Sequence, residues 1–361
     1  MLTYPLSMVP GPVSVPEQIR KVYQVNYGSG DLEPEFFDLY AETETNLKTI
    51  MGTKHSVVIQ TGEAMLVLWG ALKSCLLSKD RVLAIGTGIF GRGIGEMASS
   101  LGANVKAVNW NDNETIGDLG RVEKAIQTFK PKMITAVHCE TPSGTLNPLS
   151  ELGKLKKNYH VPLFYVDAVS SVGGAPIETD KNHIDLCLGG SQKCLSAPPS
   201  SCFLSVSDTA WDIIEQVDYA GYDALEPFRK VQKEKFFPYT PDWYGVAALN
   251  TAAKHILDEG LDKCFDRHQH AAAFCRQELI SMGFALFPAA DAVPSPTVTA
   301  VNIPLGWSWK EFDNFLRKNG LVVGGSLGPM EGKVFRLGHM GSQADMPLVK
   351  ASLEIIKRRF G

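Results

Sequence analysis

Short apolar runs that alternate with helix-like stretches dominate the first 255 residues, and this pattern constrains the fold more than any other feature. Buried-strand candidates lie at 56–60, 81–85, 104–110, 133–139, 162–169, 186–190 and 201–206. Helix-like stretches such as 119–129 and 150–157 separate them. Strands that alternate with helices form parallel sheets with right-handed crossovers. The sequence therefore predicts an α/β domain that binds ligands at the carboxyl ends of its strands.

The pattern changes after about residue 255. A long helix is predicted over 261–282, followed by the short apolar runs 284–288, 297–303, 321–325 and 334–339, with further helices at 308–319 and 345–359. Short strands covered by helices are typical of a small α+β domain. We therefore predict an extended N-terminal arm over 1–15, a large domain over 16–255 and a small domain over 256–361.

Composition and charge exclude several classes of protein. A formal net charge of −4 argues against a partner that is a nucleic acid or a membrane surface. The sequence has no apolar run long enough for a transmembrane helix and no secretory leader, which favours a cytoplasmic protein. Seven cysteines without a C-x-x-C motif suggest neither a disulfide framework nor a zinc site. We interpret His268 and His270 as solvated helix residues and expect no metal.

One glycine-rich segment matches a nucleotide-binding pattern. Gly86-Thr87-Gly88-Ile89-Phe90-Gly91 has the form G-x-G-x-x-G between a predicted strand and a predicted helix, with Asp112 further along the chain. In dinucleotide-binding proteins the helix amides bind the pyrophosphate and the acid binds the ribose. This match keeps an NAD-dependent dehydrogenase open as an alternative function, although a single short motif is weak in a chain with 33 glycines.

Two other segments contain residues that indicate a cofactor more specifically. Asp167 stands at the end of a buried strand, and Lys193 follows a turn of small residues, Gly189-Gly190-Ser191, at the end of another. A partly desolvated lysine has a lowered pKa and can form a Schiff base. A carboxylate at a neighbouring strand end can pair with a protonated pyridine nitrogen and make that ring an electron sink. The combination favours a pyridoxal-type cofactor.

Here the sequence resembles the class V, fold-type I pyridoxal-phosphate transaminases. The resemblance covers nearly the whole chain and rests on motifs that occur in the family's order: Pro10-Gly11-Pro12, His138 to Gly144 (HCETPSG), Val166 to Gly174 (VDAVSSVGG), Gly190 to Pro199 (GSQKCLSAPP), Pro238 to Pro241 (PYTP), Pro296 to Val298 (PTV) and Gly332 to Gly338 (GKVFRLG). It implies a mainly parallel seven-stranded sheet in the large domain, a small C-terminal α+β domain and a homodimer or tetramer.

The resemblance also implies a role for residues around the cofactor ring. Lys193 would carry the Schiff base and move the proton between substrate and cofactor carbons. Asp167 would bind the pyridine N–H. Val169 and Phe90 would pack against opposite ring faces, and Thr141 would bind near the ring hydroxyl.

Other residues would surround the phosphate and the substrate. Gln192 and the helix that starts at Ala64 would face the phosphate, and Thr240 and Phe237 would reach it from the neighbouring subunit. Arg336 would clamp the substrate carboxylate with its bidentate fork. Pro10 and Gly11 would complete the substrate site.

Two residues depart from the common pattern of the family. Glu63 stands where relatives usually have a small hydroxylated residue, and Phe237 stands where many have tyrosine. A carboxylate suits a helix N-terminus but not a dianionic phosphate beside it. Both departures resemble the pyridoxamine–pyruvate group, in which a glutamate at this position faces the hydroxymethyl group of unphosphorylated pyridoxal. Glu63 is therefore counted with both the cofactor-binding and the substrate-binding residues.

The sequence thus predicts a transaminase that moves an amino group to pyruvate or glyoxylate. The favoured form uses unphosphorylated pyridoxal and pyridoxamine as substrates. An ordinary alanine or serine transaminase with bound pyridoxal 5'-phosphate stays open, since Glu63 could turn aside or meet a counter-charge. A non-catalytic B6-binding protein is disfavoured because Lys193, Asp167 and Arg336 are all present. Cysteine desulfuration is disfavoured because no cysteine follows Cys275.

Overall fold

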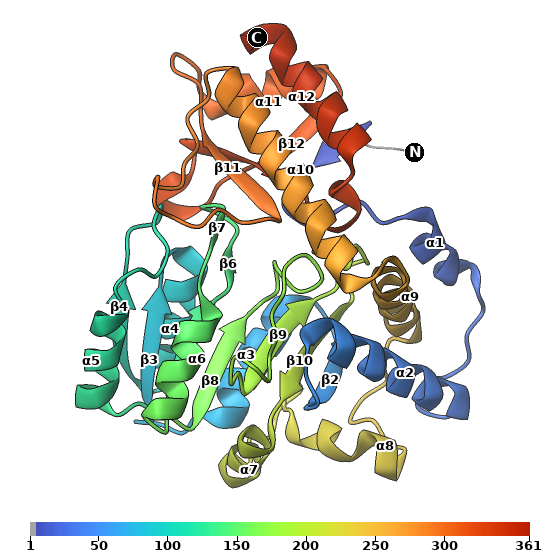
Figure 1. The fold of residues 1–361 in the computed structure, drawn as a ribbon. Helices are drawn as coiled ribbons and strands as arrows, with labels where there is room; N and C mark the ends of the chain where they lie inside the picture. The colour runs from blue at the N-terminus through green and yellow to red at the C-terminus, as the bar shows by residue number, and fades with distance from the viewer. Residues whose placement is uncertain (1–4) are drawn as a thin grey trace.

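A computed structural model describes residues 5–361 and shows two main sheets, each with its own helices (Figure 1). The larger sheet has seven strands in the order β2-β10-β9-β8-β5-β3-β4. In that order the strands are Ser56–Thr61, Ser201–Val206, Leu186–Gly190, Leu163–Asp167, Met133–Val137, Arg81–Gly86 and Asn104–Asn109. β10 runs antiparallel to both of its neighbours, and the remaining pairs are parallel. The predicted seven-stranded, mainly parallel sheet is confirmed.

Burial and connection lengths explain this arrangement. Every residue of β5, β8 and β9 is buried, as expected for parallel strands covered by helices on both faces. β9 and β10 are joined by residues 191–200 alone, and so short a segment suits an antiparallel neighbour better than a crossover. This connection carries Lys193.

Helices cover both faces of the larger sheet (Figure 1). They are α2 (Pro34–Met51), α3 (Ala64–Cys75), α4 (Ile89–Ser100), α5 (Leu119–Phe129), α6 (Leu149–Asn158), α7 (Asp208–Val217) and α9 (Trp243–Glu259). Shorter elements are α1 (Glu17–Arg20), α8 (Val231–Glu234), the two-stranded sheet of β6 (Cys139–Glu140) and β7 (Thr145–Leu146), and the 3-10 turns Lys21–Gln24, Glu226–Lys230, Gly328–Met330 and Gly341–Gln343.

The smaller sheet has the order β1-β12-β13-β11, with strands Leu6–Met8, Leu321–Gly325, Val334–Gly338 and Val298–Asn302. α10 (Leu261–Ser281), α11 (Trp309–Lys318) and α12 (Met346–Phe360) pack with it. The run at 284–288, expected as a strand, contributes only a single bridge between Leu286 and Val301. A Pro at its end and the turn before it leave too few residues for a ladder.

The N-terminal arm belongs to this smaller sheet. The segment over 1–15 is expected to be extended, and Leu6–Met8 is indeed a strand, but it pairs in parallel with β12. Chain segments from the two ends of the sequence therefore share one sheet. Residues 1–4 of the predicted arm lie outside the described residues.

The apolar cores follow the two sheets. One cluster contains the large-sheet residues and extends to Cys264, and a second contains Met8 together with residues from Ala271 to Ile356. α10 contributes to both clusters. The domain boundary at about residue 255 stays a prediction. Within residues 5–361, no helix is both long and apolar enough to cross a membrane.

Candidate active site

Four of the predicted site residues lie at the carboxyl edge of the larger sheet. Asp167 is the last residue of β8, and Lys193 lies in the loop that follows β9. Glu63 follows β2 and precedes α3, and Phe90 lies in the first turn of α4, after β3. Because these strands are parallel to one another, their carboxyl ends meet at one edge. The fold therefore brings together residues that are far apart in the sequence.

Lys193 is held under the N-terminal arm. Its Nζ donates a hydrogen bond to the backbone oxygen of Pro10 at 2.7 Å. Burial, with the Arg336 charge as a second cause, lowers the pKa of Lys193. Gly11 has φ +90°, and a Cβ there would lie 2.5 Å from Lys193 Cδ. The glycine therefore lets the arm pack directly on the lysine, and the lowered pKa favours a neutral, nucleophilic amine.

Asp167 is a buried carboxylate at the same edge. Its Oδ1 accepts a hydrogen bond from Val169 N at 2.9 Å. Burial raises its pKa to about 6, although this hydrogen bond and the Lys193 charge act in the opposite direction. Val169, in the turn that follows, is also buried. A buried carboxylate of this kind gains most from a cationic partner such as a pyridine N–H.

Glu63 occupies the N-terminus of α3. Its Oε2 accepts from Met65 N at 2.9 Å, and its Oε1 accepts from Gln192 Nε2 at 2.7 Å. Throughout residues 5–361 no lysine or arginine forms an ion pair with Glu63. Ala64, the next residue, is buried. The anion-binding end of this helix is thus already filled by a carboxylate.

Glu140 is a site residue that the sequence analysis did not single out. It is 0% exposed, and its Oε1 accepts from Gly91 N at 2.7 Å while its Oε2 lies 3.4 Å from Phe90 N. Gly88, the residue before α4, supplies no side-chain cap, so Glu140 provides that cap from a distant segment. Burial raises its pKa to about 7. The glutamate in the HCETPSG motif was the available signal.

This cap corrects the dinucleotide interpretation of G-x-G-x-x-G. The α4 amides that a pyrophosphate would need are donated to Glu140. Asp112, expected to bind a ribose in that interpretation, forms an ion pair with Arg92 instead. The glycines admit Glu140, because a Cβ on Gly88 would lie 2.6 Å from its Cδ.

Arg336 lies on β13, in the smaller sheet. Its Nε and Nη2 donate to Gly325 O at 2.8 and 2.6 Å, and burial lowers its pKa to about 10, so it stays charged at neutral pH. One edge of the guanidinium is thus fixed, and the Nη1–Nη2 edge is the one that a carboxylate would use. Ser326, which directly follows β12, donates to Pro142 O at 2.9 Å and so joins the end of β12 to the buried loop that carries Thr141.

Two residues predicted to reach a neighbouring subunit differ from each other. Thr240 is exposed. Phe237 is 4% exposed and packs against Phe36, Phe37 and Tyr40 of its own chain, with ring centroids 5.2–5.3 Å apart. This aromatic packing accounts for the burial of Phe237 within its own chain. The role predicted for Phe237 in a neighbouring subunit's site stays a prediction.

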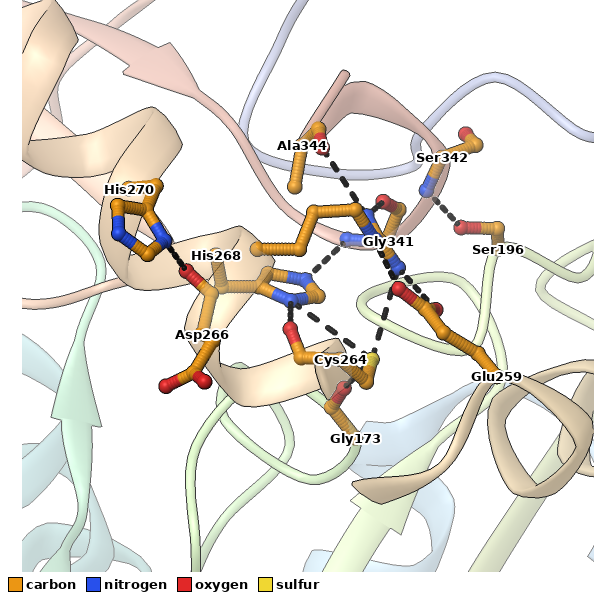
Figure 2. Close-up of polar contacts among 11 residues, drawn as sticks. Gly173, Ser196, Glu259, Cys264, Asp266, His268, His270, Gly341, Ser342 and Ala344 are labelled. Carbon is orange, nitrogen blue, oxygen red and sulfur yellow. Dashed lines mark hydrogen bonds and ion pairs between the residues drawn. The ribbon is translucent and has the colours of Figure 1, made fainter. Parts of the chain in front are cut away.

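The interpretation of both histidines of the H-x-H pair on α10 as solvated residues holds for one of them and is wrong for the other. His270 is exposed, as expected, and lies beside Asp266 O, but His268 is buried (Figure 2). Its Nε2 accepts from Gly341 N at 2.8 Å, so its Nδ1–H donates to Cys264 O at 2.7 Å. Burial lowers the pKa of His268 to about 4. His268 therefore joins α10 to the turn at 341, and within residues 5–361 no group of metal-ligating side chains is found.

Comparisons with known proteins agree with this geometry. Residues 10–332 match the family Aminotransferase class-V. The chain belongs to the class-V aminotransferases. An uncharacterized aminotransferase of Methanocaldococcus jannaschii is 33% identical, over 99% of this chain and 93% of the relative. The pyridoxamine–pyruvate transaminase of Mesorhizobium japonicum is 30% identical, over 95% of this chain and 90% of the relative.

A solved structure confirms the fold-type I architecture. The ureidoglycine–glyoxylate aminotransferase of Bacillus subtilis superimposes with a TM-score of 0.93 and 29% identity, covering 99% of this chain and 95% of that one. These aminotransferases differ in the substrates that their names give. Identity near 30% therefore establishes an aminotransferase without selecting its substrates.

The residues present fit the ring of the pyridoxal cofactor on which this family depends. Within residues 5–361 the Gln192 Oε1 atom is buried without a hydrogen-bond partner, and a Cβ on Gly190 would lie 2.7 Å from it, so the absence of a side chain at Gly190 leaves room for this amide. Lys193 and Asp167 supply an amine and a buried carboxylate at the same sheet edge. The chemistry at Glu63 suits a hydroxyl donor better than a phosphate.

Proposed function

We propose that this aminotransferase transfers an amino group between unphosphorylated pyridoxamine and a small 2-oxo acid, pyruvate or glyoxylate. The observation that carries the proposal is the Glu63 carboxylate at the N-terminus of α3, held by Met65 N and Gln192 Nε2 without a cation to pair with it in residues 5–361. A hydroxymethyl group can donate to that carboxylate, whereas a phosphate dianion cannot.

Electrostatics gives the size of the preference. Two like unit charges 4 Å apart repel by about 1 kcal/mol in water and by about 4 kcal/mol at intermediate dielectric. A phosphate dianion would meet this repulsion at the helix end that normally attracts it. A discrimination of tenfold or more against the phosphorylated form is therefore expected, since about 1.4 kcal/mol corresponds to tenfold.

The residues around the cofactor ring would have separate roles in the reaction. A bound pyridoxal ring would supply the electron sink for the pair of electrons released at the substrate carbon. Lys193 would hold the aldehyde group of the cofactor as a Schiff base and move the proton at the substrate carbon, and its lowered pKa suits both tasks. Asp167 would hold the proton on the ring nitrogen. Val169, Phe90 and Thr141 would position the ring and its hydroxyl.

The remaining assignments concern the substrate and the assembly. Arg336 would bind the carboxylate of the 2-oxo acid through its Nη1–Nη2 edge, and the Pro10–Gly11 segment, which contacts Lys193, would complete the substrate site. We also propose a homodimer in which the exposed Thr240 reaches the partner's site. The cytoplasm is the compartment we propose.

The deciding experiment titrates the protein freed of cofactor with pyridoxal and with pyridoxal 5'-phosphate and follows Schiff-base absorbance. We expect tighter binding of pyridoxal, and Glu63→Ser should reverse that order by removing the negative charge. Lys193→Ala is the control and should give no Schiff-base absorbance with either compound. Much tighter binding of the phosphorylated form by the wild-type protein would favour an ordinary pyridoxal-phosphate transaminase instead.

A further inference from the structure

The N-terminal arm lies between the two parts of the candidate site. Pro10 O accepts from Lys193 Nζ, and Val13 N donates to Gln192 O at 3.1 Å. On its other side the arm packs on β13, because a Cβ on Gly338 would lie 2.4 Å from Val9 O. Arg336 stands two residues earlier on that strand. The position of Pro10 therefore depends on whatever fixes the arm.

One side chain fixes the arm on both sides of Pro10. Gln343 is 0% exposed, and its Nε2 donates to Val9 O at 2.8 Å and to Gly338 O at 2.5 Å. Its Oε1 accepts from Ser14 N at 3.2 Å. All three bonds go to backbone atoms, so their geometry is set by the path of the chain and not by mobile side chains. Gln343 thus connects both ends of segment 9–14 to the end of β13.

The residue beside Gln343 continues this connection to the lysine loop. Ser342 Oγ donates to Ser14 O at 2.5 Å, and Ser342 N donates to Ser196 Oγ at 2.7 Å. Figure 2 shows Ser342 beside Ser196, joined by this second hydrogen bond. Ser196 N in turn donates to Lys193 O at 2.9 Å. The turn at 341–343 therefore contacts the arm and the lysine loop together.

We propose that Gln343 is a positioning residue for the reaction: by fixing Val9 and Ser14 it holds the Pro10 carbonyl at the Lys193 amine. The proposal rests on the proposed function only in taking Lys193 as the reactive amine. The Pro10 carbonyl gives the Lys193 amine one defined position whenever that amine is not bonded to cofactor or substrate. The arm packed over the amine also limits the access of water to it. Neither effect depends on which form of vitamin B6 binds.

The test compares Gln343→Leu with Asn250→Leu. Both changes remove a buried amide of similar size, but Asn250 lies on α9 and bonds Asn46 and Glu42, which belong to α2, away from the arm. Hydrogen exchange is measured across residues 5–16 in protein without added cofactor, together with kcat and KM. For Gln343→Leu we expect about tenfold faster exchange in this segment and about a tenfold lower kcat, with KM for the 2-oxo acid little changed.

Controls separate positioning from general damage. Asn250→Leu should leave arm exchange and kcat close to wild type even if it lowers the melting temperature. Ser342→Ala, a milder change, should raise exchange in the same segment by a smaller factor and serves if Gln343→Leu does not fold. Unchanged arm exchange in both arm variants, or an increase spread evenly over the small domain, would overturn the proposal. The exchange result is independent of the cofactor preference, so failure of the proposed function would be recognised separately.

Discussion

Individual acids in this molecule owe their behaviour to where the chain buries them. Glu63, Asp167 and Glu140 all lie at the carboxyl edge of the larger sheet, yet each has a different partner. Glu63 binds a helix end and an amide, and Glu140 caps a second helix. Among residues 5–361, Asp167 accepts a hydrogen bond from one backbone N–H alone, that of Val169. Asp167 is therefore the acid whose ionised form would be stabilised most by a cationic ligand.

A stability measurement checks this at Asp167. Burial raises the pKa of Asp167 to about 6 in the folded chain, whereas the unfolded chain keeps its ordinary value. The folded chain then binds more protons between these values, so ionisation of Asp167 destabilises it as the pH rises from about 4 to about 6. For the protein without cofactor, the unfolding free energy of Asp167→Asn relative to wild type should rise by about 1–3 kcal/mol from pH 4 to pH 7.

The measurement is denaturant unfolding at each pH. A difference between the two proteins that stays constant from pH 4 to pH 7 would contradict the burial argument. The same variant should lose amino-transfer activity by about a hundredfold or more, because an amide cannot hold a cationic ring nitrogen.

At the scale of one element, α4 depends on a side chain from outside itself. Its N-terminal amides bond to Glu140, and Gly88 leaves the space for that carboxylate. Gly88 has φ −173°, an extended conformation open to any residue, so the requirement for glycine is purely one of space. The first turn of α4 also carries Phe90.

Paired glycine substitutions in this region check the cap. In Gly88→Ala the added Cβ would collide with Glu140, and we expect a loss of about 1–3 kcal/mol in the free energy of unfolding as the cap is displaced. Gly93→Ala is the matched control within α4, because its Cβ would meet nothing within 4 Å. That change should stabilise the protein by about 0.5–1 kcal/mol. Equal effects of both substitutions, measured by denaturant unfolding, would contradict a role for Glu140 as the cap.

At the scale of the whole molecule, Arg267 connects α10 both to the end of α9 and to the backbone around residue 341. Arg267 on α10 bonds both carboxylate oxygens of Glu259, the last residue of α9, at 2.6 and 2.8 Å. Its Nη1 also donates to Gly341 O and Ala344 O at 2.9 and 3.1 Å. Planar, bidentate geometry of this kind cannot be reproduced by lysine.

A double-mutant cycle measures this connection. Arg267→Lys and Glu259→Gln, alone and together, should give a coupling energy of about 1 kcal/mol in the free energy of unfolding. The exposed pair Lys154–Glu151 on α6 is the control and should show almost no coupling. A coupling at Arg267 no larger than the one at Lys154 would mean that the junction is held by apolar packing alone.

The sequence alone determined the sheet and the chemistry of its edge. Apolar runs between helices predict strands from local periodicity. Asp167, which ends one strand, and Lys193, which follows another, are placed by chain order. Tertiary structure decided which side chains meet. Phe237 packs into the core of its own chain, Glu140 caps a helix some 50 residues away in the sequence, and Gln343 bonds Ser14, from which it is separated by 329 positions. Periodicity reports only which face of an element is apolar, whereas these contacts depend on how distant segments pack together.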